Sequence, residues 1–112
     1  MNSELGYVPQ NLTAKPTATT IDNVSGTATG GTAMLTATLN SANGTGLAGK
    51  VLSFTLDGAF AGTAVTDSSG VATLTGVPTS DAVGTDTGGI VASFAGDSTN
   101  KLSQNTGNLT VS

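Results

Sequence analysis

Residues 32–39, Thr-Ala-Met-Leu-Thr-Ala-Thr-Leu, alternate between two sets of side chains. In an extended strand, one face would carry Ala33, Leu35, Ala37 and Leu39, and the other would carry Met34, Thr36 and Thr38. A period of two predicts a half-buried β-strand. The same alternation returns in residues 50–56 and 89–95, and no window of helical period competes with it. The sequence therefore predicts an all-β protein.

Turn signals rich in Gly, Asp, Asn and Ser separate these runs, because Gly tolerates a positive φ and Asp and Asn cap their own turns. Between the turns we expect seven short strands: Thr17–Val24, Ala33–Leu39, Val51–Leu56, Gly62–Thr66, Val71–Thr75, Ile90–Ala95 and Asn108–Val111. About seven short strands in roughly 100 residues are typical of an immunoglobulin-like antiparallel β-sandwich. An odd number of passes should place the two ends of that domain at opposite poles.

The domain is predicted to span residues 17–112, preceded by an extended arm or linker at Met1–Pro16. Pro78–Thr87 has no clear period and is predicted to be the longest loop. The expected inward-facing residues are Leu35, Ala37, Leu39, Leu52, Phe54, Leu56, Leu74, Ile90, Ala92, Phe94, Leu109 and Val111.

Composition excludes several classes of site. The 112 residues include no His, Cys, Trp or Arg, and three Lys face seven acids, for a formal net charge of −4. The chain therefore has no Ser-His or Cys-His nucleophile pair, no imidazole or thiolate metal ligand and no disulfide. The acidic balance argues against a nucleic-acid partner, and no apolar run is long enough to insert into a membrane. A carbohydrate-binding module is disfavoured, since Tyr7 and three Phe are the only aromatic residues.

Three segments carry a family resemblance. They are GTGLAGKVLSF (44–54), GTAVTDSSGVATLTG (62–76) and SFAGDSTNKLSQNTGNLTV (93–111). Together they resemble the bacterial immunoglobulin-like (Big-type) repeat domains of surface proteins and adhesins, which also occur in phage virion proteins. The resemblance covers residues 17–112. Two departures stand out: many such repeats carry an aromatic residue where Thr99–Leu102 stand here, and the Pro78–Thr87 stretch is longer than expected.

The resemblance implies a role and no reaction. It implies a non-catalytic structural or adhesion module, a spacer or presenting domain of a bacterial cell-surface or secreted protein. The implied partners are neighbouring repeats or a host or surface receptor. The alternative is a small decoration protein on the capsid or tail of a tailed phage, bound to virion proteins through its N-terminal arm. Met1–Gln10 lacks the pattern of a secretory signal, so either a signal lies upstream or the protein is not exported through one. No catalytic residue and no cofactor are expected.

Two segments match short motifs, one of phosphate-binding loops and one of serine hydrolases. Gly44–Gly49 satisfies GxGxxG, but phosphate binding by this motif needs a helix after it, and a strand is expected here. Gly96-Asp97-Ser98 resembles the surroundings of a hydrolase serine, yet no His is present to activate Ser98. Both are interpreted as loops. An intramolecular cross-link from a lysine to an Asn or Asp would require a buried lysine beside an acid, and Lys50, at the start of an expected strand, is the only lysine placed for it.

Five acids lie at or near predicted turns: Asp57, Asp67, Asp81, Asp86 and Asp97. They are interpreted as solvated turn residues, because none follows the dense alternation of an EF-hand loop. The alternative is that several of them gather at one pole and bind calcium through their carboxylate oxygens.

Overall fold

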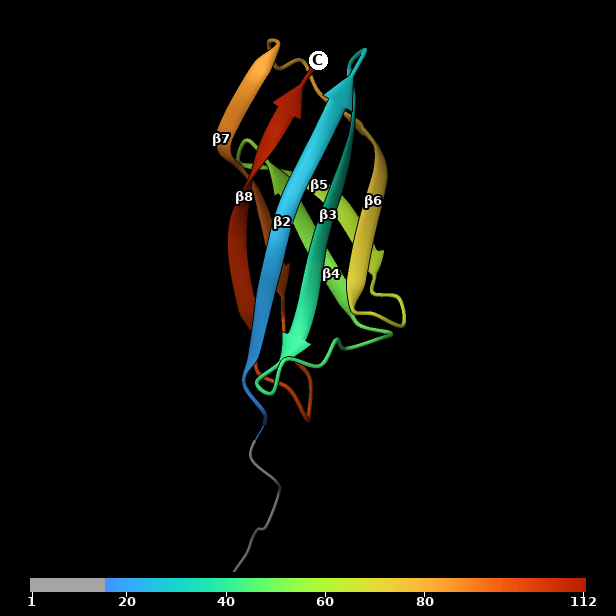
Figure 1. The fold of residues 1–112 in the computed structure, drawn as a ribbon, viewed down its shortest axis with the longest axis vertical. Coiled ribbons are helices and arrows are strands. Elements are labelled where there is room, and N and C mark those ends of the chain that lie inside the picture. The colour runs from blue at the N-terminus through green and yellow to red at the C-terminus, as the bar shows by residue number, and fades with distance from the viewer. Residues whose placement is uncertain (1–15) are drawn as a thin grey trace, which may run out of the picture.

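The computed structural model describes residues 16–112, which contain seven strands and no helix. Figure 1 shows the strands, which are β2 (Thr19–Thr29), β3 (Thr32–Ser41), β4 (Val51–Leu56), β5 (Ala59–Val65), β6 (Val71–Pro78), β7 (Gly84–Phe94) and β8 (Ser103–Val111). The prediction of an all-β chain with seven strands is confirmed. The predicted arm lies outside the described residues, apart from Pro16. The described residues contain no helix that could cross a membrane.

The strands are hydrogen-bonded into one sheet in the order β5-β4-β7-β8-β2-β3-β6. All neighbouring pairs are antiparallel except β2 and β8, which run parallel from Ser25↔Asn108 to Ala28↔Val111. The sequence analysis expects antiparallel pairing throughout, and on this point it is wrong. The reason is the odd number of strands: the first and the last run in the same direction, and here they are neighbours (Figure 1).

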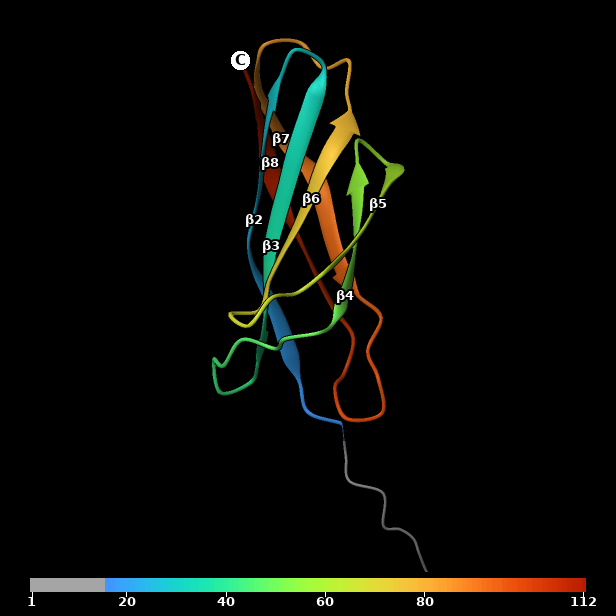
Figure 2. The same cartoon turned by 90° about the vertical axis from the view of Figure 1, so that its right-hand side faces the viewer.

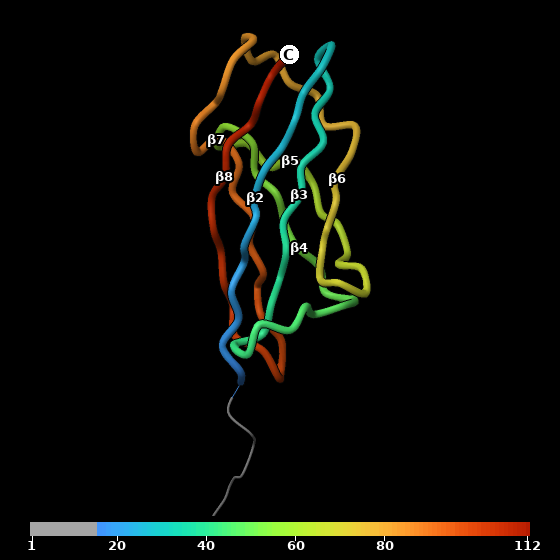
Figure 3. The backbone as a smooth tube through the Cα atoms, in the orientation of Figure 1, coloured from blue at the N-terminus to red at the C-terminus, as the bar shows by residue number. Residues whose placement is uncertain are grey.

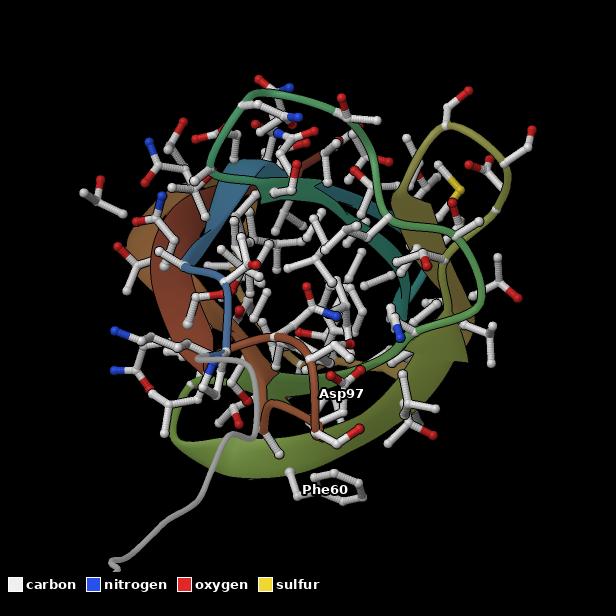
Figure 4. The ribbon with its side chains drawn as sticks, turned by 90° about the horizontal axis from the view of Figure 1, so that it is seen from below. Phe60 and Asp97 are labelled. Atoms are coloured by element: carbon white, nitrogen blue, oxygen red, sulfur yellow. The ribbon has the colours of Figure 1, made fainter. Side chains whose placement is uncertain are left out.

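The sheet curls, so that it is nearly barrel-shaped. In the turned view of Figure 2, β2 and β3 lie along one side of the molecule and β4 and β5 along the other. The edge strands β5 and β6 approach without pairing, and a Cβ atom added to Gly62 would lie 3.1 Å from Cδ2 of Leu74. Seen from below in Figure 4, the strands surround a core of side chains.

The buried core residues come from every strand except β5, whose Ala61 and Ala64 pack against the core and are partly buried. Of the twelve residues predicted to face inward, ten are buried, and Leu74 and Val111 are partly buried against them. The sequence analysis did not place Ile21, Val24, Ala28, Ala72 and Val77 in the core, although all five are buried. Because alanines supply many of these positions, the strands can approach closely over a small apolar volume.

Phe60 is an exception among the aromatic residues of the described chain. It lies on the outside of β5, where 73% of it is exposed, and in Figure 4 it points away from the core. Val51 and Val65, which face each other in the β4–β5 pair, are also exposed. The outer face of the β4–β5 hairpin therefore carries exposed apolar side chains.

Half of the predicted loop Pro78–Thr87 is strand, and the stretch is not the longest loop, because residues 42–50 between β3 and β4 form a longer connection. β6 continues to Pro78 and β7 begins at Gly84, which leaves residues 79–83 as the connection. Gly84–Asp86 pair with Leu109–Val111 of β8, and the register then shifts before Ile90. The segment Gly-Thr-Asp-Thr-Gly-Gly has no apolar alternation of its own, so its pairing is decided by β8.

The two ends of the described chain lie at opposite poles, as the odd number of strands predicts. Thr17 donates its backbone N–H to Thr99 beside the β7–β8 connection, at the lower pole. At the upper pole Ser112 donates to the carbonyl of Ala28, at the end of β2. The chain thus enters at one pole and leaves at the other.

Candidate functional site

Three of the five turn acids meet in one place. Asp57 follows β4, Asp81 lies in the β6–β7 connection and Asp86 lies in β7. One carboxylate oxygen from each lies within 4.8 Å of the other two. We call these three residues the upper acidic cluster. Asp67 and Asp97 are not part of it, because they lie in the β5–β6 and β7–β8 connections near the other pole.

Backbone contacts hold the cluster together. The Asp57 N–H donates to the carbonyl of Gly89 at 2.8 Å, which fixes the β4–β5 turn against β7. A Cβ atom on Gly89 would overlap Oδ2 of Asp86 and would lie 3.0 Å from Oδ1 of Asp57. The absence of a side chain at Gly89 is therefore what allows the two carboxylates to approach. Asp57 and Asp81 also border a surface groove with Phe60 and Pro78, so solvent and ions can reach the cluster.

Mutual proximity changes the protonation of the cluster. The pKa of Asp57 is raised to about 7, mainly because its carboxyl group, once protonated, can donate a hydrogen bond to Asp86 or to Asp81. Desolvation and the negative charges of these two neighbours act in the same direction. Near neutral pH, the Asp57 carboxyl group is therefore protonated in a substantial fraction of the molecules.

One proton cannot satisfy the whole cluster. Oδ2 of Asp81 and Oδ2 of Asp86 are both buried, and neither has a hydrogen-bond partner among the described residues. A protonated Asp57 has a single O–H, so it can donate to one of these oxygens at a time. At least one buried carboxylate oxygen stays unsatisfied, which is costly.

The GxGxxG segment forms a loop, as predicted. Gly44–Gly49 lies in the β3–β4 connection, and strand β4 follows it. The connection is packed against the β5–β6 turn. Gly46 has no room for a side chain, since a Cβ there would overlap the carbonyl of Ser69, and Gly70 is equally confined by Leu39 and Gly46. Gly46 and Gly70 therefore allow the backbones of the β3–β4 connection and the β5–β6 turn to pack closely together.

The Gly96-Asp97-Ser98 segment is also a turn with an aspartate cap, as predicted. Oδ1 of Asp97 accepts hydrogen bonds from the backbone N–H groups of Thr99 at 2.9 Å and Asn100 at 2.7 Å. Asp67 caps the β5–β6 turn in the same way, through the N–H groups of Ser69 and Val71.

Lys50 lies beside an acid, Asp97, with Nζ 2.7 Å from Oδ2. The pair joins the β3–β4 and β7–β8 connections, which lie side by side at the lower end of Figure 3. It is not the buried pair that a cross-link requires, since about 30% of each side chain is exposed (29% and 31%). The Lys50 ammonium and the turn N–H groups also hold the pKa of Asp97 well below its usual range. Because the Lys50 ammonium and the Asp97 carboxylate are both charged and reached by solvent, they form an ion pair and do not meet the requirement for a covalent cross-link.

The sequence places all three acids of the upper acidic cluster at or near turns but does not indicate that these three meet. Asp57 lies far from Asp81 and Asp86 along the chain, and only the β4–β7 pairing brings them together. Gly89 was missed altogether. Its sequence signal, the Gly88-Gly89 pair before an apolar strand, suggested only a turn.

Comparison of the chain with protein-family models, curated proteins and solved structures gave no match.

Proposed function

We propose that this chain is a non-catalytic structural and adhesive module. It acts as a spacer or presenting domain of a bacterial cell-surface or secreted protein, and its partners are neighbouring domains of the same kind or a surface receptor. The observation that carries this proposal is the placement of the two ends of the described chain at opposite poles. With that geometry, successive copies can be joined end to end without reversing the chain.

The strand arrangement supports an immunoglobulin-like assignment. β2, β3 and β6 are consecutive in the sheet, and β5, β4, β7 and β8 form the remainder. In a seven-strand sandwich the first, second and fifth strands likewise pack against a group that contains the third, sixth and seventh. β5, the fourth strand, pairs with β4 and does not pair with β6, which departs from the constant-type arrangement.

The pairing of the terminal strands supports a mechanical role. β2 and β8 are parallel neighbours, with four residue pairs from Ser25↔Asn108 to Ala28↔Val111. Force applied to the two ends of the described chain pulls these strands along their length in opposite directions. The hydrogen bonds between them are then loaded together, whereas a force that peels one strand away loads them one at a time.

The size and location of the native product test the proposed role. An antibody raised against this domain would be used on envelope, medium and phage-lysate fractions of the source. A band many times larger than 10.8 kDa in the envelope or medium is expected for a module of a surface protein. A band near 10.8 kDa that sediments with virions would contradict it and favour the alternative, a phage decoration protein at the virion surface.

Single-molecule pulling tests the mechanical part separately. The chain has no cysteine, so attachment points can be introduced freely. Anchors at Ala18→Cys and Ser112→Cys load β2 and β8 in shear. Anchors at Thr29→Cys and Ser112→Cys, both at the upper pole, peel the same strands apart. We expect a clearly higher unfolding force for the first pair at equal loading rate; equal forces would contradict a load-bearing β2–β8 pair.

A further inference from the structure

We propose that the upper acidic cluster, Asp57, Asp81 and Asp86, binds a single calcium ion, which ties the β4–β5 turn to the β6–β7 connection and β7. This inference goes beyond the spacer role and does not depend on it. It rests on the geometry of three carboxylates and on two buried oxygen atoms that have no hydrogen-bond partner within residues 16–112.

The spacing of the carboxylates fits one shared ion. Calcium binds oxygen ligands at roughly 2.3–2.6 Å, so two ligands of the same ion are at most about 5 Å apart. In this chain one oxygen from each of the three aspartates lies within 4.8 Å of the others. A single ion can therefore contact all three without a rearrangement of the backbone.

The lack of partners for two buried oxygens of the cluster is a second indication. Oδ2 of Asp81 and Oδ2 of Asp86 are buried and accept no hydrogen bond from the described residues. Oδ2 of Asp86 also points to the space over Gly89, where Oδ1 of Asp57 lies as well. Buried carboxylate oxygens are normally satisfied by donors or by a metal ion. A cation between the three groups would satisfy both oxygens at once, which a single proton cannot do.

The donor set favours calcium. The ligands are carboxylate oxygens, which suit hard cations, and the chain has no His or Cys to favour zinc or copper. Calcium accepts irregular geometry and completes its shell with water, whereas magnesium demands near-octahedral geometry. Asp57 is exposed, and Asp81 and Asp86 are only partly covered, so water can complete the shell. We expect a dissociation constant of about 0.1–1 mM, as in other open oxygen sites of extracellular modules.

The location gives the ion a structural consequence. Asp86 pairs with Leu109, two residues before the end of β8. The ion would therefore fasten the β6–β7 connection and the start of β7 near the pole where the described chain ends. Bound calcium would stiffen the pole at which Ser112 lies.

The test uses the whole 112-residue chain, freed of metal with a chelator, at pH 8, where Asp57 is ionised. Calorimetric titration with CaCl2 is expected to show one site per chain. In thermal unfolding, 10 mM CaCl2 is expected to raise the midpoint by roughly 5–15 °C, since a ligand that binds only the native state stabilises it. The same concentration of MgCl2 is expected to produce less than about a third of that shift.

Two variants localise the ion, and one serves as a control. Asp57→Asn keeps the turn, because Asn tolerates the positive φ of 52° at this position. It also supplies N–H donors to the neighbouring carboxylates, so the metal-free protein should be as stable as the wild type or more so, while the calcium shift disappears. Gly89→Ala places a methyl group against Asp86 and Asp57 and should also abolish the shift. The control Asp22→Asn removes one surface charge in β2 and should retain the full shift.

Each outcome decides the question. One calorimetric site, a calcium shift in the wild type and in Asp22→Asn, and its loss in Asp57→Asn and Gly89→Ala would support the site. The absence of heat and of a shift in the wild type would overturn it. A shift that persists in both variants would place the ion elsewhere and would also overturn it. An equal or larger response to magnesium would overturn the assignment to calcium.

Discussion

The ammonium nitrogen of Lys50 lies 2.7 Å from Oδ2 of Asp97, and this ion pair joins two connections at the lower pole that are 47 residues apart in the chain. Oδ1 of the same aspartate accepts the N–H groups of Thr99 and Asn100. One carboxylate thus both closes its own turn and holds a neighbouring one. At the opposite pole Asp57, Asp81 and Asp86 face one another, and within residues 16–112 no salt bridge joins any of them to a lysine.

The Asp97 carboxylate should contribute to stability in a pH-dependent way. Its pKa is lowered in the folded protein, so its contribution is complete above the unfolded pKa of about 4 and is lost as the pH falls toward the lower folded value. Asp97→Asn should therefore lower the urea midpoint at pH 7, and its difference from the wild type should shrink steadily below about pH 4. Urea titrations at pH 7, 4 and 2.5 would measure this.

The control for that experiment is Lys50→Gln, which removes only the ion pair. Exposed ion pairs contribute little, so its effect should be the smaller of the two and should diminish in high salt. Asn still accepts the two turn N–H groups, so Asp97→Asn removes the charge and not the cap. If Lys50→Gln and Asp97→Asn were equally destabilising at pH 7, the charge of Asp97 would act through Lys50 alone and would not strengthen the turn hydrogen bonds.

Two phenylalanines provide a matched test of the core. Phe54 is fully buried, whereas Phe60 is 73% exposed. Phe54→Ala should reduce the free energy of unfolding by about 3–5 kcal/mol, because it leaves a cavity among packed side chains. Phe60→Ala should change it by less than about 0.5 kcal/mol. Chemical denaturation of both variants would measure this, and a comparable loss in Phe60→Ala would show that the outer face of β5 is covered in solution.

The contact between Gly46 and the β5–β6 turn predicts a steric effect. Gly46→Ala would drive a methyl group into the carbonyl of Ser69, which is backbone and cannot swing away. We expect a loss of about 2–3 kcal/mol in the free energy of unfolding. Gly44→Ala is the comparison, since its Cβ would meet nothing within 4 Å and only the positive φ of 87° is unfavourable, at about 1 kcal/mol. If the two variants lost equal stability, the close packing of the turns would not be limiting.

The upper acidic cluster predicts an opposite dependence on pH when divalent ions are removed with a chelator. The pKa of Asp57 is raised from 3.8 to about 7 in the folded protein. The folded chain therefore holds a proton that the unfolded chain releases, and the free energy of unfolding should fall as the pH rises from about 4 to about 7, then level off. Asp57→Asn should remove this slope. A wild-type protein whose thermal midpoint does not fall between pH 4.5 and 7.5 would contradict the proximity of the three carboxylates.

Strand bounds are predicted best where apolar and polar side chains alternate along the chain. Val51–Leu56 was placed at its observed bounds, because Leu52, Phe54 and Leu56 mark one face. Where a strand consists mainly of polar residues, the predicted strand is shorter than the observed one. β8 begins at Ser103, well before the expected Asn108, because its first half, Ser-Gln-Asn-Thr-Gly, gains its extended structure from pairing with β7. Apolar and polar side chains alternate because one face of the strand is buried. A strand with few buried side chains therefore shows no alternation in its sequence.

Local hydrogen bonding explains why the turns were predicted more accurately. Asp67 and Asp97 each accept N–H groups within four residues along the chain, so their role is encoded in the local sequence. The upper acidic cluster is different, because each of its members belongs to a different segment. Its geometry depends on the β4–β7 register and on the space over Gly89, which no local pattern specifies.

The sequence by itself determined the all-β class, the seven strands, most of the core and the capped turns, since each of these follows from interactions between residues close together in the chain. The tertiary structure alone decided the parallel pairing of β2 with β8, the strand at Gly84–Asp86, the exposure of Phe60 and the meeting of Asp57, Asp81 and Asp86. These features depend on which strands become neighbours and in which register. That choice is made by the packing of the whole sheet, in which residues far apart in sequence compete for the same partners.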